Sequence, residues 1–181
     1  MPQLLPPALQ KYRTLLIAIT LFLCFDLGVL VPNFILSSRI KQDAIAINLA
    51  GRQRMLSQRT VKSLVQLKIA RETGIGEPET ARRELETTYQ LFDETLQGFA
   101  RGRTVTGGDG EPVFLPAATS PRAQELVQAA LAIWQPYRDF LLPVLEARPD
   151  SEALVAAIDY AQEHNLILLD LMNQMWVRAP A

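Results

Sequence analysis

One short segment of the chain combines polar and apolar residues in a spacing that suits anion binding. It runs over Ile47–Arg59 and reads INLAGRQRMLSQR. At 100° per residue, Arg54 and Gln58 share one apolar helical face, and Gly51 lies one turn earlier. An arginine on an apolar face needs an anion or a carboxylate partner, because an unpaired buried charge is costly. The candidate ligand-binding residues on this face are Ile47, Ala50, Gly51, Arg54 and Gln58.

The same helix carries a second apolar face and a polar edge. One apolar face is enough to pack it into its own bundle, so the face with Arg54 predicts a seam between two copies of the chain. Two Arg54 side chains would converge there, and a small planar anion bridging them would remove their repulsion. Two alternatives stay open: Arg54 pairs with a carboxylate of its own bundle, or it extends into water. The second face holds Leu49, Leu56, Leu64 and Leu67, and the edge, which we expect to be solvated, holds Asn48, Arg52, Arg59 and Lys62.

Composition excludes several other classes of protein. At 181 residues and net charge −1, the chain fits one domain with a short appendage and lacks the positive charge of a nucleic-acid binder. One cysteine, Cys24, excludes a disulfide, and one histidine, His164, disfavours a histidine-rich metal site or a catalytic triad. Acids such as Glu84, Glu86 and Asp93 lie on a heavily charged helix and fit a solvated face. We therefore expect no metal, no cofactor and no enzymatic activity.

An apolar run near the N-terminus predicts a membrane anchor. It covers Leu15–Val31 and extends to Leu36, which meets the roughly 20 residues that a spanning helix needs. A cleaved signal peptide is the rival, but no small-x-small cleavage site follows. Flanking positive charges are nearly balanced, so the orientation rests on the usual arrangement for such anchors. Asp26 inside the run either meets a partner helix or is merely tolerated. The expected division is a cytoplasmic tail (1–13), a transmembrane helix (14–36) and a periplasmic domain (37–181).

The remainder reads as helix interrupted by Gly and Pro. We expect the first helix to end near Glu72, a second to run from Pro78 to about Gly102, and a third to begin at Pro121 with Ser120 as its cap. Residues 104–119 read as a loop, and no strand periodicity is sustained. Two prolines should kink the third helix or end it early. The fold class is all-α: a transmembrane helix that continues into an up-down-up-down four-helix bundle. The prolines are Pro136 and Pro143, and the apolar stripe of the fourth helix is Leu154, Ile158, Ala161, Asn165, Leu168, Met172 and Met175.

The segment Ile47–Arg59 resembles the signature of the PilJ/NarX-like sensor domain. That family includes the N-terminal domains of type IV pili chemotaxis transducers and the nitrate-sensing histidine kinases. Weaker similarity extends to Trp134 and to residues 165–173. The resemblance implies an extracytoplasmic four-helix bundle that dimerises along its first helix. In members that bind nitrate or nitrite, the anion lies between the two copies of that helix, held by the arginine that Arg54 matches; Gly51 matches the family's glycine.

The chain departs from the family at its end. Family members continue into a second span and a signalling module, whereas the last apolar stretch here, Leu166–Val177, is too short to cross a bilayer. We therefore expect a homodimeric sensor, anchored in the bacterial inner membrane, that binds nitrate or nitrite and signals through a separate kinase or chemoreceptor. The alternatives are a structural or adaptor bundle that contacts another membrane protein, and a remnant of a larger receptor.

Overall fold

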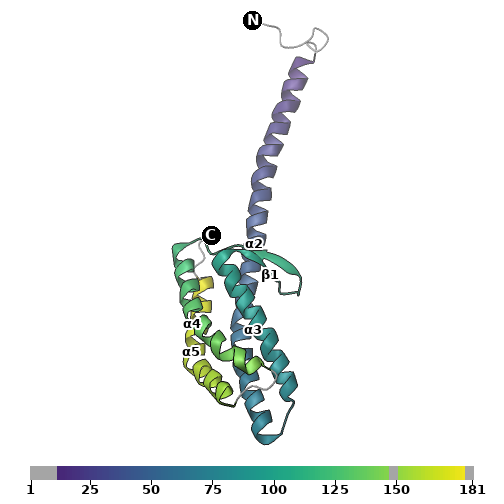
Figure 1. Ribbon diagram of the computed structural model, residues 1–181. Coiled ribbons are helices and arrows are strands. Elements are labelled where there is room, and N and C mark those ends of the chain that lie inside the picture. Colours follow the sequence, from purple (N-terminus) through teal and green to yellow (C-terminus); the bar gives the residue numbers. More distant parts are fainter. Residues whose placement is uncertain (1–11, 147–150, 178–181) are drawn as a thin grey trace. The chain divides into compact units, whose positions relative to one another are not determined.

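The computed structural model describes residues 12–146 and 151–177. These residues fall into two compact units, Met1–Asp43 and Ala44–Ala181. The predicted tail, residues 1–13, lies outside the described residues except for its last two. The elements of the described part are α2 (Arg13–Thr73), α3 (Pro78–Arg101), β1 (Arg103–Thr106), β2 (Pro112–Leu115), α4 (Pro121–Leu145) and α5 (Ser151–Val177) (Figure 1).

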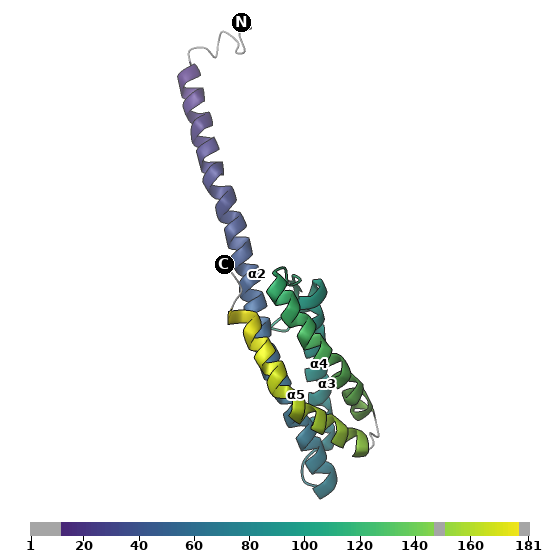
Figure 2. The ribbon, with the colours of Figure 1, turned by 90° about the vertical axis from the view of Figure 1, so that its left-hand side faces the viewer.

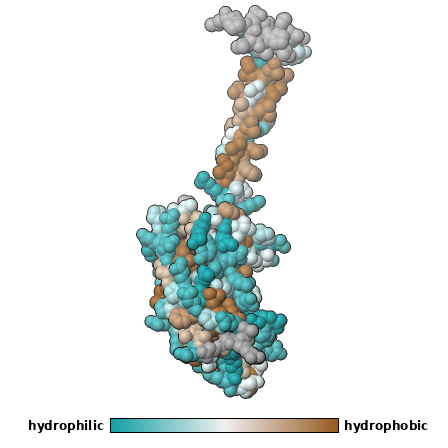
Figure 3. All heavy atoms as spheres, viewed as in Figure 1, coloured by the Kyte–Doolittle hydropathy of each residue, from teal (hydrophilic) through white to brown (hydrophobic). Residues whose placement is uncertain are grey.

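The first unit consists of the N-terminal part of α2. By length and composition this is the one helix of the described residues that can cross a membrane, and none of its apolar window is buried. Apolar side chains cover it in Figure 3. The predicted span, 14–36, lies within it. Pro32 lies inside the helix, where it has no N–H to donate to the carbonyl of Gly28.

In the second unit the predicted helix boundaries are largely confirmed. α3 begins at Pro78 and ends at Arg101, where Gly102 adopts a φ of 69° that glycine accepts without strain. Ser120 caps α4, and its hydroxyl accepts a hydrogen bond from the backbone N–H of Ala123 at 3.2 Å. Of the two effects expected of the prolines, a kink or an early end, the early end is not seen, since α4 passes Pro136 and Pro143 and reaches Leu145. Its apolar stripe stays buried on both sides of Pro136, so packing outweighs the lost hydrogen bond.

The core of this unit is centred on Trp134 of α4. Its ring lies 4.2 Å from that of Phe92 on α3, and its Nε1 donates a hydrogen bond of 2.8 Å to Asp93. Asp93 also forms an ion pair of 3.3 Å with Arg138, so the expectation that it lies on a solvated face is wrong. The largest fully buried side chains are Trp134, Phe92, Leu49, Leu56, Leu64, Leu67, Leu85, Leu96, Leu115, Leu141, Leu168 and Met172. They come from α2, α3, β2, α4 and α5, so every helix of the unit contributes to one core.

Side-chain hydrogen bonds join the remaining helix pairs. Gln53 of α2 is fully buried and donates to the carbonyl of Phe92 on α3 at 3.0 Å. Ser57 of α2 donates to the side-chain oxygen of Asn165 on α5. The Tyr160 hydroxyl of α5 donates to the carbonyl of Ile133 on α4 at 2.9 Å. With the Trp134 contacts, these bonds connect α2 to α3, α3 to α4, α4 to α5 and α5 to α2.

The expectation that the chain has no strand is wrong. Residues 103–115 form an antiparallel hairpin, in which Arg103 pairs with Leu115 and Thr106 with Pro112. Its turn closes through the N–H of Gly107, which donates to the carbonyl of Glu111 at 2.7 Å. Each strand has only four residues, too few for an alternating pattern to emerge from the sequence. The buried residues of the two strands, Val105 and Leu115, pack on α3 beside Gly98, where a Cβ would come within 2.8 Å of Leu115.

Candidate functional site

The part of α2 in the second unit has one buried and one exposed face. The buried face is the predicted leucine face, and all four leucines are at most 2% exposed. They occupy helical positions about 180° to 260° away from Ile47. Packing within the bundle therefore uses the face opposite the candidate residues. The leucines are Leu49, Leu56, Leu64 and Leu67.

The exposed face carries four of the five candidate residues. Ile47, Gly51, Arg54 and Gln58 are all exposed, and they follow one another along the helix. Ala50 is different: it is fully buried within its own bundle. Its position, 60° from Ile47 on the helical wheel, is enough to turn it toward the core. The expectation that Ala50 lines the ligand face is therefore wrong.

Arg54 and Gln58 have no hydrogen-bonding or ionic partner within residues 12–146 and 151–177. The alternative in which Arg54 pairs with a carboxylate of its own bundle is thus not seen there. The side chain extends into solvent, where its charge is hydrated and costs nothing to leave unpaired. The face is open on this side, since a Cβ at Gly51 would meet no atom within 4 Å. Within the described residues of one copy of the chain, this face of α2 is therefore open and carries an unpaired positive charge.

Arg52, two residues earlier, contradicts the expectation of a solvated edge. Its guanidinium is partly buried and donates to the carbonyls of Thr106 and Gly107 at 2.5 and 2.6 Å. It also donates to the hydroxyl of Thr95 at 3.2 Å. Burial lowers the pKa of Arg52, and the charge of Glu94 partly offsets this shift. Arg52 is therefore a structural residue that fastens the hairpin turn to α2 and α3.

Arg59, on the same edge, keeps much of its exposure. Its Nη2 forms an ion pair of 3.0 Å with Glu84 on α3, and its side chain is 48% exposed. An ion pair this open to water contributes about 0–1 kcal/mol to stability. Of the arginines in the segment Ile47–Arg59, Arg54 alone is both exposed and unpartnered among the described residues.

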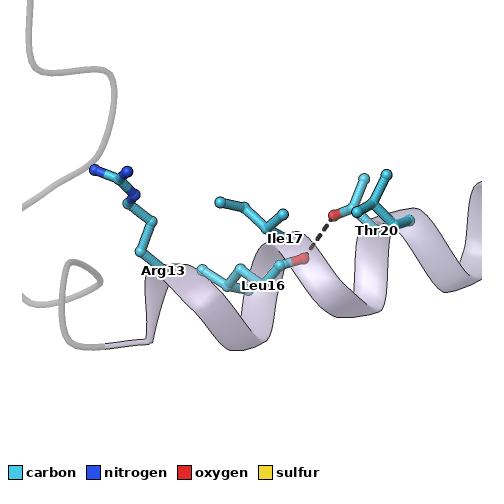
Figure 4. A pocket seen from close by; sticks show the side chains of 5 residues that line it. Arg13, Leu16, Ile17 and Thr20 are labelled. Atoms are coloured by element: carbon cyan, nitrogen blue, oxygen red, sulfur yellow. Dashed lines mark hydrogen bonds between the residues drawn. The ribbon is translucent and has the colours of Figure 1, made fainter.

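Two concave regions lie elsewhere, and neither suits an anion. A cleft of roughly 330 Å³ separates the hairpin turn from the start of the second unit, and the carboxylates of Asp109 and Glu111 would repel an anion there. The other is an apolar groove between Arg13 and Leu21 (Figure 4), whose lining residues all come from one helix. The exposed face of α2 remains the best candidate.

Comparison with known proteins gives one match. The family profile described as the type IV pili methyl-accepting chemotaxis transducer N-terminal domain matches residues 35–160. The match includes the exposed face of α2, the hairpin, α4 and the first part of α5. No curated protein and no solved structure matches the chain.

Proposed function

The chain belongs to the PilJ family, the N-terminal domains of type IV pili methyl-accepting chemotaxis transducers, and on this premise we propose that it senses a small anion, nitrate or nitrite first among candidates. The family makes the chain a sensory and signalling module. We further propose that α2 anchors it as a single-pass protein in the bacterial inner membrane, with the second unit in the periplasm. It has no enzymatic role and relays binding to a separate kinase or chemoreceptor.

The proposed scaffold is an up-down-up-down four-helix bundle built from the second unit. Three observations support it. The four residues between α2 and α3 leave room only for a sharp reversal of direction. The contacts described above connect the four helices in a closed ring. In Figure 2, α4 and α5 lie side by side and run in opposite directions.

A single observation carries the proposed site: among the described residues Arg54 has no partner, and it lies on an exposed face of α2 that is otherwise fit for contact with a second copy. Ile47 and Val65 lie two and three turns away on the same face, and both are exposed. In a two-fold dimer this face meets its own copy. Gly51, with no side chain of its own, allows the two helix backbones to approach closely.

Such a dimer brings the two Arg54 guanidinium groups together. At about 7 Å and an effective dielectric constant of about 20, their repulsion is about 2 kcal/mol. A planar anion between them accepts paired N–H donors from both sides and removes the repulsion. The amide group of Gln58, one turn further along, adds a donor. The anion therefore stabilises one arrangement of the two helices over others, which is the condition for a ligand to shift a conformational equilibrium.

Calorimetric titration of the full chain in lipid nanodiscs tests this proposal. Nitrate or nitrite should release heat, chloride should release much less, and Arg54→Ala should abolish the signal. Arg83→Ala is the matched control, because Arg83 is also exposed but lies on α3. Absence of heat with every anion refutes anion sensing. A signal that survives Arg54→Ala refutes the proposed site.

An adaptor role is the second candidate, favoured by an exposed apolar pair on α5. Leu166 is 73% exposed and Ile167 is 51% exposed, so two adjacent apolar side chains of α5 are open to contact. If this pair binds another membrane protein, Leu166→Lys should release a stoichiometric partner while Arg54→Ala should not. Release by neither variant would count against the adaptor role.

A further inference from the structure

Two polar side chains interrupt the apolar segment of α2 at an interval of seven residues. Asp26 and Asn33 are both exposed, and neither has a hydrogen-bonding partner within the described residues. Seven residues of α-helix turn through 700°, so the two side chains lie within about 20° of each other on the helical wheel. Ser37, four residues further, lies on the same face. This segment therefore carries a polar line along an apolar helix.

Thr20 shows that a polar side chain in this segment can be satisfied within its own helix. Its hydroxyl donates to the carbonyl of Leu16 at 2.8 Å (Figure 4). Asp26 and Asn33 do not reach a carbonyl in this way. In the hydrocarbon of a bilayer, polar groups without partners are costly, and they are met by hydrogen bonds from a neighbouring helix. The polar line thus marks the face on which another helix packs.

The chemistry of this line favours a second copy of the same chain. An asparagine amide both donates and accepts, so Asn33 is complementary to itself across a two-fold axis. Counting onward from Asn33 in sevens reaches Ile40, Ile47 and Arg54 in the sequence. The same interval therefore recurs on the face that the proposed function assigns to the dimer seam.

We propose that two copies of the chain associate through their apolar segments, with Asn33 of one segment hydrogen-bonded to Asn33 of the other and Asp26 on the same face. This inference rests on the homodimer of the proposed function and adds a polar contact within the membrane. Its role is to fix the register of the two segments, as a single buried asparagine does in a coiled coil.

Two adjacent serines provide a matched test by disulfide cross-linking. In the full chain in native membranes, with Cys24→Ser as background, Ser37→Cys should form a disulfide-linked dimer on oxidation. Ser38→Cys should not, because it lies about 100° away from Ser37 on the helical wheel, and a disulfide requires Cα atoms within about 7 Å. The natural Cys24 is a second control, because it lies about 160° from Asp26 and should stay unlinked.

Substitution of Asn33 tests its own contribution. Asn33→Leu, combined with Ser37→Cys, should lower the cross-linked fraction about threefold to tenfold, the effect expected of hydrogen bonds between membrane helices. Asp26→Asn should retain or raise it, since an amide at this position can both donate and accept. Unchanged cross-linking in Asn33→Leu would overturn the role of Asn33.

Cysteine at position 47, in the second unit, separates failure of this inference from failure of the proposed dimer. If Ile47→Cys cross-links and Ser37→Cys does not, the inference is wrong and the dimer along α2 stands. If neither cross-links, both are wrong. Equal cross-linking of Ser37→Cys and Ser38→Cys, or a Ser37→Cys product with a different protein in place of the dimer, would also overturn the inference.

Discussion

Arg52 and Arg54 lie two residues apart on α2, yet their side chains meet opposite surroundings. Arg52 turns toward the hairpin, where three acceptors from α3 and the turn surround its guanidinium. Arg54 turns away from the bundle and has no partner among the described residues. Because these positions are 200° apart on the helical wheel, one side chain faces the hairpin and the other faces solvent. Residue type alone therefore does not identify a ligand-binding arginine; the surroundings of its face do.

The largest expected effect is on the free energy of unfolding, in a comparison of the buried Leu64 with its exposed neighbour Val65. Leu64→Ala should lower the free energy of unfolding by about 2–5 kcal/mol, because Leu64 is fully buried and its loss leaves a cavity. Val65→Ala, on the exposed face, should change it by less than about 0.5 kcal/mol. Denaturant unfolding of the full chain in detergent measures both. Equal losses of unfolding free energy in the two variants would show that Val65 is covered by other protein atoms in solution.

Substitution of Arg52 and Arg54 by methionine gives the next largest expected difference in stability. Arg52→Met keeps the aliphatic part of the side chain and removes its three hydrogen bonds, so it should cost about 2 kcal/mol. The amide of Gly107 should also lose protection from hydrogen exchange, because the turn that Arg52 holds would open. Arg54→Met should leave stability and protection unchanged. A destabilised Arg54→Met protein would mean that Arg54 has a structural partner in solution.

The helices and their apolar stripes were predictable from the sequence. Periodicity and capping residues place α3 and the start of α4 almost to the residue, because Pro78, Ser120 and Pro121 act through local backbone chemistry. The two faces of α2 follow from the same periodicity. Ala50 was assigned to the wrong face because it lies at the boundary between the two faces of α2. At that position the helical wheel does not distinguish a buried from an exposed side chain, and the structure shows that Ala50 is buried.

The role of Arg52 was not predictable in the same way. Its acceptors are backbone carbonyls more than fifty residues away in the sequence, in a hairpin too short to leave a periodic signal. The buried polar residues of α2 were missed for another reason. Gln53, Ser57 and Thr60 recur at the spacing of the buried leucines, so their positions were visible, but their polarity hid their burial. The anion and the second copy that we propose as partners of Arg54 lie outside a single copy of the chain, and no pattern within one sequence specifies them.

Two glycines allow the same comparison between a packed and an exposed position. Gly98 packs against the hairpin, whereas Gly51 lies on the exposed face of α2. Gly98→Ala should cost about 1 kcal/mol, because the gain in helix propensity is smaller than the clash of a Cβ with Leu115 and Val105, 2.8 and 2.9 Å away. Gly51→Ala should raise the stability of one copy by up to about 1 kcal/mol, since nothing obstructs the added methyl group. Thermal unfolding measures both. The association of two copies, measured by its dependence on protein concentration, should weaken in Gly51→Ala but not in Gly98→Ala. Unchanged association in Gly51→Ala would argue against close approach of two α2 helices at this position.

A pair of tyrosines shows that an unpartnered polar group is costly only where water is excluded. The Tyr137 hydroxyl is buried without a partner among the described residues, whereas that of Tyr160 donates to Ile133. Tyr137→Phe should therefore be neutral or stabilising by about 1 kcal/mol, and Tyr160→Phe should cost about 1 kcal/mol.

The same burial gives Tyr137 a dependence on pH. Burial raises its pKa well above the ordinary value of 10.0, so the folded state keeps the proton after the unfolded state has lost it. The contribution of Tyr137 is therefore fully present below pH 10 and declines as the pH rises above it. Unfolding followed from pH 8 to about 11 should show a shallower alkaline decline in Tyr137→Phe than in the natural chain. An identical alkaline decline in the two proteins would mean that water reaches the Tyr137 hydroxyl. Tyr137 would then resemble the solvent-exposed Arg54 more than the partly buried Arg52.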